Sequence, residues 1–509
     1  MENIIQISIM LMLKTLLTHS LIEGEDMQDY VVLLNLDDPT CHALARRLRA
    51  DSIYCRIMPA DAAADEVLAS GARGMILATG CTGHAADIPL MMDYLQTGLP
   101  MLCLGDAALT LCLTLGGKLS TPVDSAIATV SFDHDDSLFD SVEDGERLLP
   151  ARSMMVFTEA QGDVCAAADD EVIGIHARQR DVWGLSFPLE RNDPATAQLM
   201  VNFARDVCGC TQWWTGRAFI ERARAAILEA AEDGEALCAL SGGVDSGVSA
   251  LLGNLALGQK LHCIFVDTGL LREGEAEEVM EAYQHQVGLN VRRVDARAEF
   301  LLALKAVTDP GEKERIISSL LKDILRREAE SLPGVKLILR GTNYADTPVT
   351  DDVSTLPAGV KVIEPVRELF KDEIRQVGES LGLSPAMISR QPFPGSGLAS
   401  RIMASVTAER LALLRTADAI FRREIEQAGL NRRLWQYFAA LALSPLPDGG
   451  VMVILRAVQA AEGGSGMPAR IPSDLLERVT AEVMQECPEV QRVFYDCTPS
   501  KTYARLAGK

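Results

Sequence analysis

The chain has 509 residues, of which 48% are hydrophobic and 23% charged, and its formal net charge at pH 7 is −23. This length predicts two to four domains, each able to bury a core of its own. The acid excess argues against nucleic acid as a partner, because sequence-independent binding comes from clustered Lys and Arg. Small anionic substrates stay open, since a single basic pocket is enough to bind them.

Residues 1–27 form an N-terminal extension ahead of the first predicted strand. Their apolar stretch is interrupted by Gln6, Ser8 and Lys14 and is too short to span a bilayer. The stretch lacks a basic leader and a small-residue cleavage site, so a secretory signal is a poor fit. We expect either that Met27 is the natural start or that the segment is a short amphipathic extension. No membrane association is expected.

Residues 28–208 alternate short apolar runs with helical patterns. The runs at 30–36, 74–80, 100–105 and 182–187 end in glycine or polar residues, as the buried strands of a doubly wound sheet do. The segment 129–154 has the composition of a hairpin and loops. The pattern predicts a first α/β domain over 28–208.

A second series of strands and helices occupies residues 209–395. Strands are predicted at 236–240, 261–267, 289–296 and 335–340, separated by helical stretches, which gives βαβ units and a parallel sheet. Ligand sites in such sheets lie at the carboxyl ends of the strands. The Pro- and Gly-rich passage 390–402 marks the next boundary, and 396–509 reads as a small α+β domain.

The turn after the strand at 236–240 reads Ser-Gly-Gly-Val-Asp-Ser and precedes a helix. Free amides and the positive end of a helix hold phosphate in such turns. A Walker loop would carry a lysine, whereas no lysine lies between Gly234 and Gln259. The loop carries Asp245 instead, a carboxylate suited to Mg²⁺ on a departing pyrophosphate. The sequence therefore predicts cleavage of ATP between its α- and β-phosphates.

SGGVDS is the signature of the ATP pyrophosphatase (PP-loop) family, and the resemblance goes further. The segments IFVDTGLLREGEAEEVM, EPVRELFKDEIRQVGESLGL, RQPFPGSGL, VILRAV and VFYD resemble, in this order, segments of the glutamine-hydrolysing GMP synthetase family. The similarity covers residues 28–498. It implies adenylation of the 2-oxo group of XMP with ATP and Mg²⁺, followed by displacement of AMP by ammonia to give GMP. It also implies a cytoplasmic homodimer formed through the last domain.

The same resemblance assigns roles to individual residues. Asp245 would anchor the metal and Lys371 would supply the positive charge that the loop lacks; the alternative for Lys371 is a solvated lysine on a helix face. ATP-binding positions would be Ser241, Gly242, Gly243, Val244, Asp245, Ser246, Val266, Asp267, Gly341 and Thr342. Positions toward the purine nucleotide would be Arg272, Arg390, Pro392, Phe393, Gly395 and Lys501.

In the resembling family the first domain is a class I glutamine amidotransferase, and here its catalytic residues are missing. The nucleophile position, after the strand at 100–104, is Gly105, and the histidine position is Pro188, while Glu190 survives. Cys103 lies inside the strand, where its thiol is expected to be buried, and His176 is expected at a strand end. Without a base there is no thiolate. Glutaminase activity is expected to be lost, so ammonia would be free or come from a separate glutaminase.

Two departures leave the acceptor open. The stretch 347–363 is shorter than in the family and has no histidine, and the C-terminus lacks the acidic base-reading end, with Lys501 as a stand-in for the family lysine. One alternative is a PP-loop ligase with another oxo-heterocycle or nucleophile, of which sulfur ranks below nitrogen because no cysteine pair suits a relay. Another is a non-catalytic paralogue, against which the intact SGGVDS and LFKDE segments count.

Overall fold

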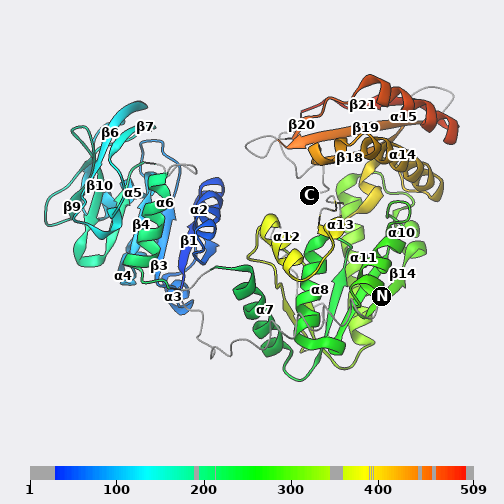
Figure 1. The fold of residues 1–509 in the computed structure, drawn as a ribbon, viewed down its shortest axis with the longest axis horizontal. Coiled ribbons are helices and arrows are strands. Elements are labelled where there is room, and N and C mark those ends of the chain that lie inside the picture. The colour runs from blue at the N-terminus through cyan, green and yellow to red at the C-terminus, as the bar shows by residue number, and fades with distance from the viewer. Residues whose placement is uncertain are drawn as a thin grey trace. The chain divides into compact units, whose positions relative to one another are not determined.

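The computed structural model describes residues 29–187, 194–211, 214–343, 359–388, 390, 393, 395–444, 450–460 and 466–499. The chain divides into two compact units, Met1–Thr215 and Gly216–Lys509 (Figure 1). The first extends beyond Cys208 because Trp214 packs on it: its ring stacks on Tyr54 at 4.9 Å between centroids, and its backbone N–H donates to Ser52 O at 2.7 Å.

Unit 1 is built on a nine-stranded sheet with the order β2-β1-β3-β4-β11-β10-β9-β6-β7. The strands from β2 to β11 are parallel and those from β10 to β7 antiparallel, so the predicted hairpin region and α/β core are both confirmed. The elements are β1 Val31–Asn35, α2 Asp38–Ala50, β2 Cys55–Pro59, α3 Ala64–Ala69, β3 Gly74–Ala78, α4 Met91–Gln96, β4 Met101–Leu104, α5 Asp106–Thr114, β5 Lys118–Leu119, β6 Ala126–Phe132, β7 Gly145–Leu149, β8 Met155–Val156, β9 Asp163–Ala168, β10 Glu171–Ala177, β11 Val182–Leu185 and α6 Pro194–Asn202.

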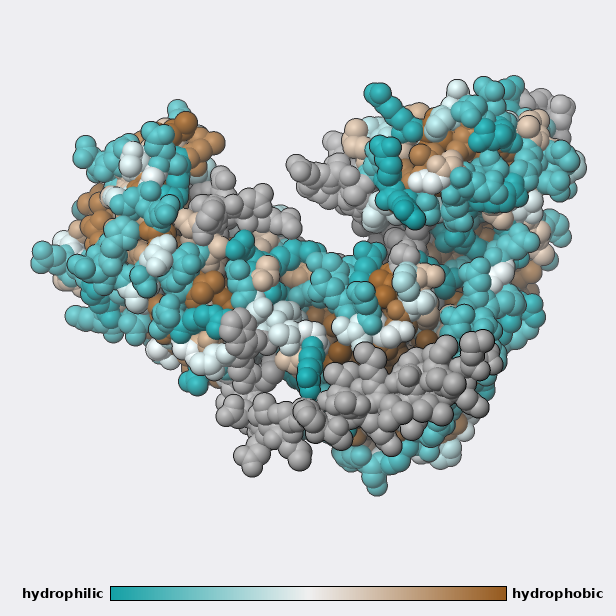
Figure 2. Space-filling view, in the orientation of Figure 1, coloured by the Kyte–Doolittle hydropathy of each residue, from teal (hydrophilic) through white to brown (hydrophobic). Residues whose placement is uncertain are grey.

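Burial along the strands follows their neighbours. The four residues of β4 are all buried, as expected for a parallel strand covered on both faces. In β6, by contrast, buried and exposed residues alternate because one face meets solvent. Ile127 and its cross-strand partner Leu148 are 70% and 63% exposed. Figure 2 shows apolar surface at the end of unit 1 that carries β6 and β7.

The first half of unit 2 contains a parallel sheet with the order β14-β13-β12-β15-β16. Helices α7, α8 and α12 pack together on one face, and α10 and α11 lie together on the other (Figure 1). Strand order reverses between β12 and β15, which is where such sheets bind ligands. The elements are α7 Gly216–Ala231, β12 Glu235–Leu240, α8 Val244–Leu257, β13 Leu261–Asp267, α9 Glu275–Met280, β14 Val291–Asp295, α10 Arg297–Leu304, α11 Pro310–Glu330, β15 Val335–Leu339, β16 Lys361–Ile363, α12 Lys371–Ser380 and α13 Pro385–Ile388.

The second half of unit 2 is a smaller mixed sheet on which helices α14 and α15 pack (Figure 1). Its core is continuous with that beneath α10 and α11: Phe300 and Leu304 belong to one cluster with Leu414 and Phe421. A boundary between residues 395 and 396 remains a prediction, with one core running across it. The elements are β17 Ile402–Met403, α14 Ala408–Gln427, β18 Gln436–Leu443, β19 Val451–Ala460, β20 Gly466–Pro468, α15 Ser473–Glu486 and β21 Val490–Tyr495.

Across the described residues, no helix combines the length and the apolar character that crossing a membrane requires.

Candidate active site

The phosphate-type loop joins β12 to α8 at the centre of the parallel sheet. Gly242 has φ +82°, and a Cβ there would lie 2.6 Å from the Val279 side chain, so only glycine fits. The loop braces itself: Ser246 Oγ accepts from Ser241 N at 3.1 Å and donates to Gly243 O at 3.0 Å. Helix α8 begins at the next residue, so its free amides and positive end face the turn.

The loop after β15 touches this turn directly. A Cβ on Gly341 would lie 2.6 Å from Ser246 N and 2.9 Å from the carbonyl carbon of Asp245. These two backbones pack more closely than any side chain would allow, and Thr342 follows at the same strand end. The structure thus brings Gly341 and the SGGVDS residues together, as the resemblance implied.

Asp245, in the first turn of α8, is the centre of a polar cluster. Its Oδ2 accepts from Lys371 Nζ at 2.5 Å and from Asn343 Nδ2 at 3.2 Å. Lys371 is the first residue of α12, where the helix dipole disfavours a positive charge, so the carboxylate compensates for its placement. The alternative of a merely solvated helix-face lysine is therefore wrong. Asn343 was not singled out from the sequence, although it lies in the same GTN turn as Gly341.

The second oxygen of Asp245 suits a metal ion. Oδ1 is buried and has no hydrogen-bond partner among the described residues. No group of three or more His, Cys, Asp or Glu side chains is gathered for a metal anywhere in that part of the chain. Mg²⁺ is commonly held by one or two carboxylates together with substrate phosphates and water. A single free carboxylate oxygen beside a phosphate-type loop fits that mode of binding.

Asp267 ends the neighbouring strand β13 and is already engaged. Arg293 Nη2 donates to its Oδ2 at 2.6 Å, and Gly269 N donates to its Oδ1 at 3.0 Å. Val266 precedes it and packs against the hydrophobic core. Both predicted residues therefore lie at the carboxyl end of β13, with the carboxylate fixing the turn that follows.

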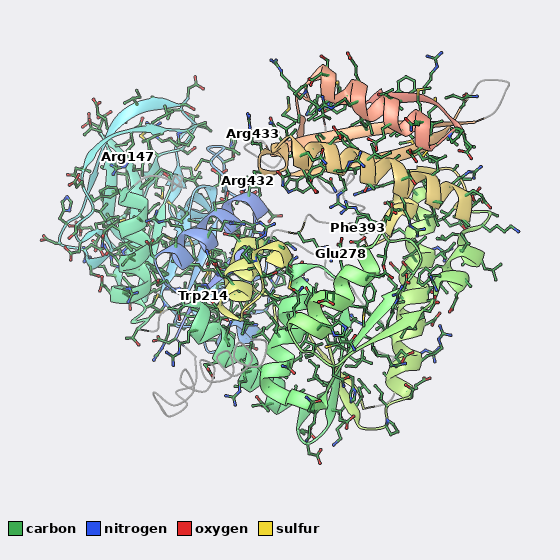
Figure 3. All side chains as sticks on the ribbon, turned by 45° about the vertical axis from the view of Figure 1, so that its right-hand side comes forward. Arg147, Trp214, Glu278, Phe393, Arg432 and Arg433 are labelled. Carbon is green, nitrogen blue, oxygen red and sulfur yellow. The ribbon has the colours of Figure 1, made fainter. Side chains whose placement is uncertain are left out.

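A buried cationic cluster lies beside this turn. Arg272 Nε is 3.3 Å from Asp418 Oδ2, and Arg401 Nη1 is 3.5 Å from Asp418 Oδ1. Both guanidinium groups also lie over the ring of Phe393, at 4.4 and 5.1 Å from its centroid. Phe393 is labelled in Figure 3, below helix α14 in that view. One carboxylate against two guanidinium groups leaves net positive charge in the interior.

The same cluster has unused hydrogen-bonding capacity. Burial lowers the pKa of Arg401 to about 9 and also lowers that of Arg272. Three nitrogens of Arg401, two of Arg272 and both amide atoms of the fully buried Gln436 have no hydrogen-bond partner among the described residues. Buried polar groups are normally paired, so this arrangement is suited to an anionic ligand. Arg401, Asp418 and Gln436 were missed by the sequence analysis; an acid within the apolar stripe of α14 was the available signal.

Arg390 connects two segments of the site. Its Nη1 donates to Gly242 O at 3.0 Å, and its Nη2 donates to Glu275 Oε1 at 2.8 Å. Gly395, also predicted toward the purine nucleotide, has open space around its Cα. Pro392 and Lys501 lie outside the described residues, as do Pro188, Glu190 and the extension over 1–27.

The amidotransferase elbow of unit 1 keeps its shape but has no room for a side chain. Gly105 has φ +67°, and a Cβ there would lie 2.3 Å from Thr79 O. The next residue, Asp106, is 7% exposed, and its carboxylate accepts from Thr82 N at 2.8 Å and from Gly83 N at 3.2 Å. The amides beside the elbow are thus occupied by the chain's own carboxylate.

The cysteine and histidine considered as replacements are also placed by the structure. Cys103 is fully buried inside β4, as predicted, and burial raises the pKa of its thiol far above the usual range. His176 lies near the end of β10, 6% exposed, with Nδ1 2.6 Å from Asp136 Oδ2 and its ring stacked on Trp183. Neither residue stands at the elbow.

Comparisons with known proteins agree with this arrangement. The family model for the GMP synthase C terminal domain matches residues 423–504. The glutamine-hydrolyzing GMP synthases of Caldicellulosiruptor saccharolyticus and Geobacillus kaustophilus are each 35% identical to this chain, over 502 and 500 residues. Both alignments cover 92% of this chain and 98% of the relative.

Two further comparisons complete the picture. The corresponding enzyme of Bacillus cytotoxicus is 34% identical over 501 residues, covering 92% of this chain and 97% of the relative. The crystal structure of a GMP synthase component from Thermoplasma acidophilum covers 36% of this chain and 96% of its own, with 18% identity and a TM-score of 0.30, a likeness too weak to argue from. On the identity and coverage of the full-length relatives, the chain belongs to the GMP synthase family.

Proposed function

We propose that the chain is an ATP-dependent C–N ligase that aminates XMP to GMP, with AMP and pyrophosphate as the other products. The observation that carries the proposal is the cluster of Asp245, Lys371 and Asn343 against the turn at Gly242 and Gly243. It combines amide donors, an ammonium group and a carboxylate oxygen without a partner among the described residues. The names of the relatives, which cover nearly the whole chain, support the choice of substrate.

In the proposed chemistry, the 2-oxo oxygen of the purine attacks the α-phosphorus of ATP, and the bond to the β-phosphate breaks. Ammonia then adds at carbon 2, loses protons, and displaces AMP, which leaves with the former 2-oxo oxygen. The loop amides and Lys371 stabilise the charge that develops on the departing pyrophosphate. Asp245 would hold Mg²⁺ through Oδ1, and the ion would supply neutralisation of phosphate charge.

The acceptor nucleotide is proposed to place an anionic group at the buried cluster of Arg272 and Arg401. Unpaired guanidinium nitrogens in the interior are suited to bidentate contacts with phosphate. Phe393 would present a ring face next to both guanidinium groups. Arg390, Pro392, Gly395 and Lys501 remain proposed contacts of the same nucleotide.

Ammonia is proposed to come from solution or from a separate glutaminase, not from unit 1. The support is the missing side chain at Gly105 and the carboxylate of Asp106 on the neighbouring amides. A glutamine amide would need those donors for its developing oxyanion.

We further propose a cytoplasmic homodimer formed through the last sheet. Ile454 and Phe494 are paired between β19 and β21, and Phe494 is 47% exposed. An apolar sheet face of this kind favours self-association. Sedimentation of the purified chain tests it: a dimer is expected, and a monomer at assay concentrations contradicts it.

The function is tested with purified chain, XMP, ATP and Mg²⁺, supplied with either ammonium or glutamine. GMP is expected with ammonium alone. GMP formation from glutamine at a comparable rate would overturn the proposed loss of glutaminase activity. Hydrolysis of ATP without any GMP would overturn the choice of acceptor.

A further inference from the structure

Glu275 is a buried carboxylate that the proposed chemistry does not use. It begins helix α9, and its side chain is only 7% exposed. Its two oxygens have different partners: Oε1 accepts from Arg390 Nη2 at 2.8 Å, and Oε2 accepts from the backbone N–H of Arg272 at 3.0 Å. One side chain therefore holds both a guanidinium group and the turn that carries Arg272.

The guanidinium group continues the connection to the phosphate-type loop. Arg390 Nη1 donates to Gly242 O at 3.0 Å, so a single hydrogen-bonded path joins the loop to the turn at Arg272. Helix α9 also touches the loop directly, since Val279 lies 2.6 Å from the position of a Cβ on Gly242. A movement of the loop on its nucleotide has little freedom to leave the α9 segment unmoved.

The far end of the path is the cationic cluster. Arg272 extends from the turn held by Glu275 to Asp418 at 3.3 Å and to the ring of Phe393 at 4.4 Å. Helix α14 holds the same turn from the other side, because Arg415 Nε donates to Leu271 O at 2.8 Å. The direction of the Arg272 guanidinium group is thus set by backbone that Glu275 fixes.

We propose that Glu275 is a positioning residue that couples ATP binding to binding of the acceptor nucleotide, through Arg390 on one side and the Arg272 turn on the other. The inference rests on the proposed function, since it needs the two nucleotide sites to lie at the two ends of this path. Coupling of this kind is a ratio of affinities and is reciprocal between the two ligands. A purely structural ion pair would weaken both ligands, or the fold, without changing that ratio.

The chain offers matched variants. Glu275→Gln keeps the shape of the side chain but leaves one acceptor oxygen where two are used. Arg390→Lys keeps the charge but cannot donate to Gly242 O and Glu275 with the same fork. Glu278→Gln is the control, because its carboxylate lies 3.7 Å from the same guanidinium nitrogen and is 72% exposed.

The experiment measures the dissociation constant of XMP by calorimetry, with and without a non-hydrolysable ATP analogue and Mg²⁺. For the unaltered chain and Glu278→Gln, the analogue is expected to tighten XMP about fivefold or more. For Glu275→Gln and Arg390→Lys the ratio is expected to fall to about one, with unchanged melting temperature. A ratio in Glu275→Gln equal to that of the unaltered chain, or no coupling in the unaltered chain, overturns the inference. Failure of the unaltered chain to bind XMP at all would instead overturn the proposed acceptor.

Discussion

Lys371 Nζ lies 2.5 Å from Asp245 Oδ2 although the two residues are 126 positions apart in the chain. The ammonium group comes from the start of α12 and the carboxylate from the start of α8, so two helix N-termini meet over one site. The loop therefore obtains its lysine from another element. A Walker loop, by contrast, carries its own.

Replacement of Asp245 tests the carboxylate. Asp245→Asn leaves a side chain of the same size that still accepts from Lys371 but holds a divalent cation poorly. Pyrophosphate release is expected to fall at least about 100-fold, the usual scale for loss of one preorganised charge contact. Asp372→Asn, an exposed carboxylate in the first turn of α12, is the control and should stay within about twofold. Full turnover in Asp245→Asn would contradict this role.

Replacement of Gly341 tests the contact between the two loops. In Gly341→Ala the new Cβ would lie 2.6 Å from Ser246 N, so the phosphate-type loop must shift. The KM for ATP is expected to rise at least about tenfold, and stability to fall by about 1–3 kcal/mol. The control is Gly216→Ala at the start of α7, where the nearest atom to the new Cβ is 4.0 Å away. Equal KM values for both variants would show that the contact has no role in ATP binding.

Introduction of a cysteine at the elbow tests the loss of glutaminase activity. In Gly105→Cys the Cβ would lie 2.3 Å from Thr79 O, at a positive φ that costs further energy. Unit 1 is expected to lose about 1–3 kcal/mol of stability, and glutamate is not expected to be released from glutamine. Gly145→Cys adds a thiol to the same unit where no atom lies within 4 Å, and should be neutral. Release of glutamate by Gly105→Cys would show that the elbow is still competent.

Lys313 gives unit 2 a dependence on pH. Its Nζ donates to the carbonyl oxygens of Ile402 and Ala404 at 2.6 Å, Arg410 and Asp309 are the charged groups near it, and burial lowers its pKa to about 8. Between this pH and the ordinary lysine value of about 10.5 the folded chain has lost a proton that the unfolded chain still binds. The free energy of unfolding from this group therefore rises with pH across that window.

The matching measurement compares urea unfolding of the unaltered chain and of Lys313→Met at pH 7.5 and 9.5. The midpoint of the unaltered chain should move upward relative to that of Lys313→Met as pH rises. Parallel behaviour of the two proteins would mean that Lys313 does not titrate in this range.

Local sequence predicted most of the fold because its signals are local. The apolar runs that became β1, β4 and β12, and the helix α15 at Ser473–Glu486, follow from composition and period over a few residues. The SGGVDS turn was recognisable for the same reason. The mixed sheet of unit 1 is less evident, because antiparallel pairing of β6 with β9 joins residues far apart in sequence.

The polar clusters depend on tertiary contacts and were only partly predictable. Asn343 meets Asp245 through the closeness of two loops, which a Gly-Thr-Asn tripeptide does not reveal. Asp418 lies on α14, a helix whose charged residues otherwise look like solvent contacts, and only packing shows that it is 1% exposed between two arginines. Glu275 likewise reads as one of several acids in an acidic helix.

The central claim is that ATP activates the purine by adenylation of its 2-oxo oxygen at the loop after β12. It is tested most directly with XMP that carries ¹⁸O at the 2-oxo position, incubated with ATP, Mg²⁺ and ammonium, followed by mass spectrometry of the products. The account predicts that the label appears in the phosphate group of AMP, with none in pyrophosphate. Label found in water or inorganic phosphate, with unlabelled AMP, would contradict it.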